Sequence, residues 1–153
     1  MSAELHFLQQ TLHQDIPLTR AMGLAVTEWD GRRLCLELPL EPNINHQLSM
    51  FGGSLYSGAV LAGWGWLTLR LRAAALDRSH VVIQHAEVSY PHPVDGTARA
   101  LCEGPSDEHW SRFEQTLRRR GRARLALRTW VLNPANEEAV RFDGRFVVQR
   151  DDA

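Results

Sequence analysis

The chain has 153 residues, a length that suits one domain with its own hydrophobic core, and we expect residues 1–153 to form that domain. The formal net charge is −1, which argues against a general polyanion binder and predicts no nucleic-acid partner. The two cysteines, Cys35 and Cys102, lie far apart in apolar runs. They predict two buried free thiols rather than a metal site or a disulfide.

The first sixteen residues place four apolar side chains at helical spacing, which predicts a helix that ends before Pro17. One further turn is expected up to Gly23. The same segment lacks the cationic start and the apolar core of a signal peptide. We therefore expect a cytoplasmic protein.

Residues 24–40 contain two alternating apolar runs joined by Asp30 and Gly31, a pair typical of a tight β-hairpin. Leucines 34, 36 and 38 share one face of the second run. The loop of residues 41–50 then leads into a predicted helix over residues 50–76. This helix is apolar on all sides, so we expect it to be wrapped by other elements.

Residues 51–69 carry no formal charge and could be mistaken for a membrane span. Five glycines interrupt them, two arginines follow at once, and strand-like patterns lie on both sides. A helix buried inside a sheet explains these features better, so no membrane partner is predicted.

The remaining chain reads mainly as strands, over residues 80–90, 97–104, 121–133 and 139–150. A helix is inserted at residues 105–121, with Asp107 as the expected N-cap and Gly121 as its end. Its apolar stripe consists of Trp110, Phe113 and Leu117. The element order predicts an α+β fold in which an antiparallel sheet curls around one long central helix.

Two segments carry a resemblance to a known family: "NINHQLSMFGGSLYSGAVLAGWGWL" and "HAEVSYPHPVDG". They resemble the putative-thioesterase hotdog family, found alone or as the C-terminal domain of acetyltransferase-like bacterial proteins. Some members are malonyl-ACP decarboxylases, which supply acetyl-ACP (ACP, acyl carrier protein) to start type II fatty acid synthesis. The resemblance covers roughly residues 15–150 and implies a hotdog fold.

The same resemblance implies a homodimer or a dimer of dimers, with acyl-thioester sites at the subunit boundary. The substrate would be an ACP or coenzyme A thioester. It would bring its own phosphopantetheine, so no other cofactor is expected.

The candidate site lies where the loop meets the long helix. Gly52 and Gly53 would leave backbone N–H groups open to a ligand oxygen, and Asn45 and His46 lie just upstream. Together they would stabilise a carbonyl oxygen that becomes negative during reaction. The expected catalytic residues are Asn45, His46, Gly53 and Ser54. The alternative is that the glycines only permit close packing and the asparagines only cap turns.

Further residues are expected to bind the substrate: Met50, Phe51, Gly52, Tyr56, Val88, Ser89, Tyr90, Arg118, Arg119, Arg122 and Arg124. The arginines could bind the acyl carrier protein or the phosphates of the substrate. The alternative is that they form an ordinary solvated basic face. The other histidines lack ligand spacing, so no metal site is predicted.

The chain has no carboxylate between Glu41 and Asp77. Thioester hydrolysis in hotdog enzymes generally uses an Asp or Glu on or near the central helix, whereas decarboxylation of a malonyl thioester needs no protein base. Among the activities that the resemblance implies, the missing carboxylate therefore favours that of a malonyl-ACP decarboxylase, a carbon–carbon lyase. An acyl-ACP or acyl-CoA thioesterase and a non-catalytic acyl-thioester binding module remain open alternatives.

Overall fold

The computed structural model describes residues 2–151, which contain one six-stranded sheet in the order β1-β2-β4-β5-β6-β3. All neighbouring strands are antiparallel. The bounds are β1 Ala25–Trp29, β2 Leu34–Leu38, β3 Ser79–Ser89, β4 Ala98–Cys102, β5 Arg122–Leu132 and β6 Glu138–Arg150. Each strand expected from the sequence is present.

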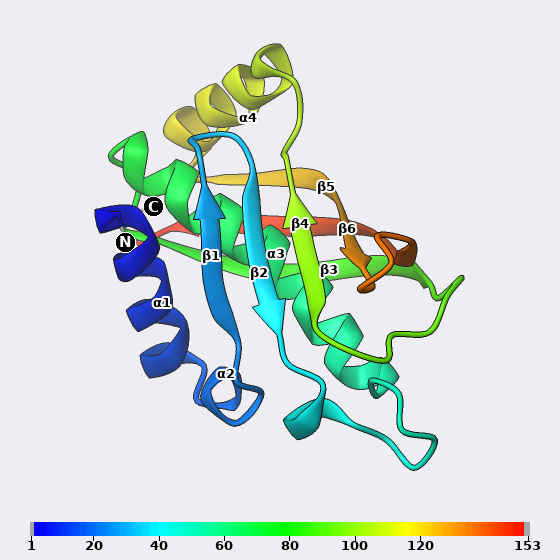
Figure 1. Ribbon diagram of the computed structural model, residues 1–153. Helices are drawn as coiled ribbons and strands as arrows, with labels where there is room; N and C mark the ends of the chain where they lie inside the picture. Colours follow the sequence, from blue (N-terminus) through cyan, green and yellow to red (C-terminus); the bar gives the residue numbers. More distant parts are fainter. Residues whose placement is uncertain (1, 152–153) are drawn as a thin grey trace.

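The central helix α3, Gly52–Ala73, lies inside the curve of this sheet and contacts β2, β3, β4, β5 and β6 (Figure 1). Small residues allow the close approach. A Cβ atom at Gly58 would come within 2.9 Å of the Leu38 side chain, and one at Gly63 within 2.8 Å of Phe146. The predicted α+β hotdog fold is confirmed. Within residues 2–151 no helix is both long and apolar enough to cross a membrane.

The helix begins two residues later than expected, at Gly52 rather than near Met50. Met50 instead forms a β-bridge with Ile44, and its N–H group donates to the Val94 carbonyl at 2.7 Å. The backbone at this point is therefore extended, which places the helix start at the mouth of the loop.

Two short helices precede the sheet, α1 Ala3–Asp15 and α2 Leu18–Ala21, followed by Gly23 with a φ of +67°. The helix α1 runs alongside β1 (Figure 1). Gln9 accepts a hydrogen bond from the Val26 N–H at 2.7 Å and donates to the Leu24 carbonyl at 3.2 Å. These contacts occupy backbone groups beside the outer edge of β1, so α1 covers that edge of the sheet.

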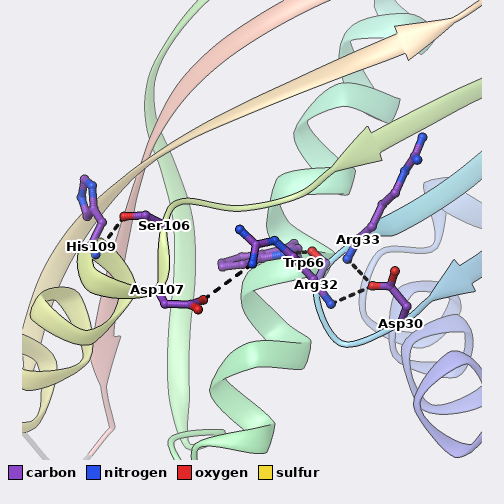
Figure 2. Close-up of polar contacts among 7 residues, drawn as sticks. All are labelled: Asp30, Arg32, Arg33, Trp66, Ser106, Asp107 and His109. Atoms are coloured by element: carbon purple, nitrogen blue, oxygen red, sulfur yellow. Dashed lines mark hydrogen bonds and ion pairs between the residues drawn. The ribbon is translucent and has the colours of Figure 1, made fainter.

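The predicted hairpin of β1 and β2 is present, but its turn is centred on Gly31 and Arg32 rather than on Asp30 and Gly31. Asp30 lies at the start of the turn, where its Oδ1 accepts from the N–H groups of Arg32 and Arg33 at 2.9 and 2.6 Å (Figure 2). These backbone hydrogen bonds, that of Arg33 above all, lower the pKa of the Asp30 carboxyl.

The inserted helix α4, Asp107–Arg120, is capped by Ser106 and not by Asp107 as predicted. The Ser106 Oγ accepts from the His109 N–H at 3.2 Å, while Asp107 occupies the first helical position and lies 3.9 Å from Arg32 (Figure 2). The expected stripe of Trp110, Phe113 and Leu117 is buried, and Gly121 ends the helix with a φ of +72°.

The helix α4 closes the C-terminal end of α3. Trp110 packs edge to face on Trp66 at 5.4 Å, and the Arg70 guanidinium lies 4.9 and 4.6 Å from the two rings. Arg118 donates to the Ala74 carbonyl, just beyond α3, at 2.7 Å. The N-terminal end of α3 lies at the opposite side of the molecule from these contacts.

Cys35 and Cys102 are buried free thiols, as predicted. Burial raises the pKa of both thiols, that of Cys102 to about 12. Both are therefore neutral and unreactive at physiological pH.

The packing of α3 gives a stability prediction. Gly63→Leu should lower the free energy of unfolding by about 1–3 kcal/mol, because the new side chain overpacks the contact with Phe146. Chemical denaturation measures the change. Ala73→Leu, on an exposed position of the same helix, is the matched control and should change stability little. Equal stability of the two variants would contradict the close packing of sheet and helix.

Candidate functional site

The loop before α3 is held in place by Asn43, which is 3% exposed. Its Nδ2 donates to the carbonyls of Met22 and Pro39 at 2.9 and 2.8 Å, and its own carbonyl accepts from the Phe51 N–H at 2.7 Å. Asn43 thus ties three segments of the chain together at the helix start.

Asn45 has its amide oriented by its own loop. Its Oδ1 accepts from the N–H groups of Gln47 and Ser49 at 2.9 and 3.2 Å, and from the Ser49 hydroxyl at 3.3 Å. Because these donors fix the oxygen, the Nδ2 group remains as the available donor. It makes no hydrogen bond to any residue in 2–151. Asn45 can therefore present a neutral N–H to a ligand without losing its loop contacts.

The first turn of α3 also presents free donors. Phe51 precedes the helix without a side-chain cap, and the first N–H groups bonded to its carbonyl are those of Ser54 and Leu55. The N–H groups of Gly52 and Gly53 consequently have no acceptor within the described chain. A Cβ atom at Gly53 would lie 2.3 Å from the Phe51 ring, so glycine lets that ring lie directly against the backbone.

The end of β3 borders the same helix start. A Cβ atom at Gly52 would lie 3.9 Å from the Tyr90 ring, and Tyr90 follows β3 directly. Burial, with a smaller effect from Tyr56, raises the pKa of the Tyr90 phenol, which stays protonated at neutral pH as a hydrogen-bond donor. Tyr56 packs edge to face on Phe142 at 5.8 Å.

The remaining expected catalytic side chains are less constrained. His46 is exposed and makes no hydrogen bond or ion pair with another described residue, and Ser54 is half-buried. The nearest acidic residue on the neighbouring strand, Glu87, has a side chain that is 84% exposed and lies 4.0 Å from His85. The loop and helix of residues 42–76 thus offer neutral donors and no carboxylate of their own, while Asp95 directly follows Val94, whose carbonyl accepts from the Met50 N–H.

The predicted residues fall into two groups at opposite ends of α3. Those around its first turn and the end of β3 are Asn45, His46, Met50, Phe51, Gly52, Gly53, Ser54, Tyr56, Val88, Ser89 and Tyr90. The arginines lie at the far end, on α4 and β5. Arg118 already bonds to Glu114 and to the Ala74 carbonyl, whereas Arg119, Arg122 and Arg124 are exposed.

One hollow was not predicted from the sequence. It has a volume of about 350 Å³ and opens between α1, the second half of α3 and the start of β3. Its lining includes the rings of Phe7 and Trp64 and the hydroxyls of Thr11, Thr68 and Ser79. These residues are far apart in the chain and form no motif, so only the fold brings them together.

Among residues 2–151 no three His, Cys, Asp or Glu side chains are grouped so as to hold a metal ion. The site contains hydrogen-bond donors at a helix N-terminus, next to exposed aromatic rings and enclosed by a hotdog sheet. The fold is that of a hotdog protein, and the start of its central helix presents neutral N–H donors that have no acceptor within residues 2–151.

The comparisons with known proteins assign the family. A family model described as putative thioesterase (yiiD_Cterm) matches residues 5–150, and the chain belongs to this family. A protein of unknown function from Chlorobaculum tepidum is 32% identical, with a TM-score of 0.90 over 98% of this chain and 100% of that one.

Two further solved structures are described as thioesterases. One, described as a putative thioesterase from Shewanella oneidensis, is 28% identical, with a TM-score of 0.82 over 96% of this chain and 98% of that one. A probable thioesterase from Pseudomonas aeruginosa, at 19% identity and a TM-score of 0.81 over 94% of each chain, shares the fold.

The role of Asn43 can be tested by stability. Asn43→Ala should lower the free energy of unfolding by about 1–3 kcal/mol, because the carbonyls of Met22 and Pro39 would lose their donor. Thermal and chemical denaturation measure the loss. Gln115→Ala, at an exposed position of α4, is the control. If Asn43→Ala were as stable as this control, Asn43 would not be the anchor of the loop.

Proposed function

We propose that this chain is an enzyme acting on acyl thioesters, and that its reaction is the decarboxylation of malonyl-ACP to acetyl-ACP and CO₂. The acetyl-ACP would serve to start type II fatty acid synthesis. Phosphopantetheine would arrive on the substrate, and no other cofactor is invoked. The proposal departs from the family description, putative thioesterase, which names thioester hydrolysis.

The free donors account for binding of the thioester carbonyl. The N–H groups of Gly52 and Gly53 and the Nδ2 group of Asn45 would donate to its oxygen. The positive end of the α3 dipole adds to the stabilisation of negative charge there. These donors are fixed before the substrate arrives, so they need little reorganisation as charge develops.

In the reaction, the bond between the carboxylate carbon and the methylene carbon of the malonyl group breaks. CO₂ leaves, and the electron pair of the broken bond forms the enolate of the thioester, whose oxygen the donors stabilise. The methylene carbon then takes a proton from water or from a hydroxyl such as that of Ser54 or Tyr56. The product is the acetyl thioester.

The observation that carries this proposal is the absence of any Asp or Glu from residue 42 through 76. A carboxylate beside the Gly52 and Gly53 amides would activate water for hydrolysis, and it would also repel the malonyl carboxylate and the enolate. Neutral donors without such a base suit a reaction in which the substrate supplies its own electron pair.

Hydrolysis of an acyl-ACP or acyl-CoA thioester is the second candidate. It is favoured by the description of the family and by that of the Shewanella neighbour. His46, which is exposed and unpaired within the described chain, would then be the base that activates water. A non-catalytic binding module would use the same donors for affinity alone.

We also propose that the active form is a homodimer, or a dimer of dimers. On the single chain the helix start is open: Phe51 is 57% exposed and Tyr90 49%. Decarboxylation benefits from excluding water around the substrate carboxylate, so a second subunit would complete the pocket.

A mass-spectrometric assay on malonyl-ACP with purified protein separates the candidates. The proposal expects acetyl-ACP, hydrolysis would give free holo-ACP, and a binding module would leave malonyl-ACP unchanged. Malonyl-CoA, tested in parallel, would show which carrier the enzyme prefers. Release of holo-ACP without acetyl-ACP would overturn the lyase assignment.

Asn45→Asp tests the role of the Asn45 Nδ2 donor separately from the hydrogen bonds that hold the loop. The variant keeps an oxygen for the N–H groups of Gln47 and Ser49 but replaces the free Nδ2 donor with a negative oxygen. Turnover of malonyl-ACP should fall by about 10² or more, the scale for losing one oxyanion donor. Asn136→Asp makes the same chemical change in an exposed turn and should retain activity. Near-wild-type turnover by Asn45→Asp would remove Asn45 from the mechanism.

A further inference from the structure

Four exposed arginines form what we call the arginine patch: Arg119 and Arg120 at the end of α4, and Arg122 and Arg124 on β5. Within residues 2–151 none of the four side chains has a hydrogen bond or an ion pair. Other arginines on β5 and β6 are paired instead: Arg128 with Asp143 at 2.9 Å, Arg145 with Gln84 at 3.0 Å and Arg141 with Glu138 at 3.4 Å. The patch is therefore a local excess of positive charge on a chain of net charge −1.

The surface around the patch suits an acidic protein rather than a second copy of this chain. A hollow of about 210 Å³ between α4 and β5 is lined by residues that include His109, Arg112 and Arg124, without a carboxylate. Two copies meeting here would set arginine against arginine, which is repulsive, whereas acidic side chains and a phosphate are attracted. An acyl carrier protein has both.

The patch is far from the candidate site of its own chain. Arg122 pairs with Gln149, and Gln149 pairs with His80 at the start of β3. Tyr90, next to Gly52, lies at the other end of that strand. The eleven residues of β3 span roughly 33 Å, which exceeds the reach of an extended phosphopantetheine arm.

Dimerisation through the outer edge of β3 would place the arginine patch of one subunit near the candidate site of the other. The two edge strands differ, because α1 lies along β1 while no strand or helix of the described chain runs along the outer edge of β3, where the Val81 carbonyl accepts from Trp64 Nε1 at 3.2 Å (Figure 1). Val82 and Ile83 on this edge are 57% and 36% exposed. An edge of this length with exposed apolar residues favours pairing with a second strand.

A two-fold pair of β3 strands would run antiparallel. Full overlap sets Ser79 of one chain opposite Ser89 of the other, so the partner's α3 N-terminus lies at the end that carries the arginine patch. Arg122 would then be three strand spacings away from the partner's β3, with β6 and β3 in between, roughly 14 Å at the usual strand spacing.

We propose that the arginine patch of one subunit docks an acidic acyl carrier protein whose phosphopantetheine delivers its thioester to the α3 N-terminus of the partner subunit. The inference rests on the proposed acyl-thioester function. It adds a docking surface for the carrier, and it states that this surface and the site it serves belong to different subunits of the dimer.

The docking surface is tested by charge reversal. The double variant Arg122→Glu/Arg124→Glu should raise KM for malonyl-ACP roughly tenfold or more, with kcat retained and turnover of malonyl-pantetheine unchanged. Arg20→Glu/Arg32→Glu makes the same change in net charge on α2 and on the β1–β2 turn and should leave KM near wild type. Equal KM values for the two double variants would overturn the docking surface.

Delivery to the partner is tested by cross-linking in mixed dimers, with a carrier whose phosphopantetheine thiol bears a bromoacetyl group. One subunit carries His46→Cys, and the two native thiols are buried and do not compete. The cross-link should be lost when Arg122→Glu/Arg124→Glu is in the other subunit and kept when it is in the His46→Cys subunit. The reverse pattern, equal cross-linking in both, or a monomer in solution would overturn delivery to the partner.

The cross-linking result does not depend on turnover. If the mixed dimers cross-link the carrier in the expected pattern while the wild-type protein leaves malonyl-ACP unchanged, the decarboxylase is refuted and the docking geometry is supported. Turnover of malonyl-ACP to acetyl-ACP together with the reverse cross-linking pattern would support the decarboxylase and refute delivery to the partner subunit.

Discussion

The structure depends on how closely the sheet approaches its central helix. The small residues of α3 bring strands from both halves of the sheet against its backbone, to the point that the Thr129 hydroxyl donates to the Ala59 carbonyl at 2.9 Å. A charged side chain in that interior would have no water and no partner, which explains why the helix carries none until Arg70. This enclosure does not extend to the start of the helix, where Phe51 is 57% exposed and a carboxylate would meet water.

Much of this fold was predictable because the signals are local and periodic. Alternation in the strands, the apolar stripe of α4 and the glycines that end helices each act over a few residues. The predictions that were wrong also concern single positions. Ser106 and Asp107 are both good caps, and only the backbone angles decide which one bonds to the helix. Likewise, an Asp before Gly reads as the centre of a turn, although here Asp30 begins it.

The site was predictable in its parts but not in its arrangement. Asn43 and Asn45 are two residues apart and alike in sequence, yet one is buried against Met22 and Pro39 and the other keeps a free N–H group. That difference depends on distant segments, which no local pattern describes. For the same reason the sequence grouped the arginines with the site, whereas the fold places them at the opposite end of α3.

The covering of β1 by α1 also limits how many copies can join through the sheet. A sheet with two open edges can add strands without end and form fibres. Here Gln9 bonds to the Val26 N–H on the edge formed by β1, whereas no strand of the described chain lies beyond β3. If copies join through β3 alone, growth by strand addition would stop at a pair, and one glutamine on α1 would help to separate a finite particle from an open-ended polymer.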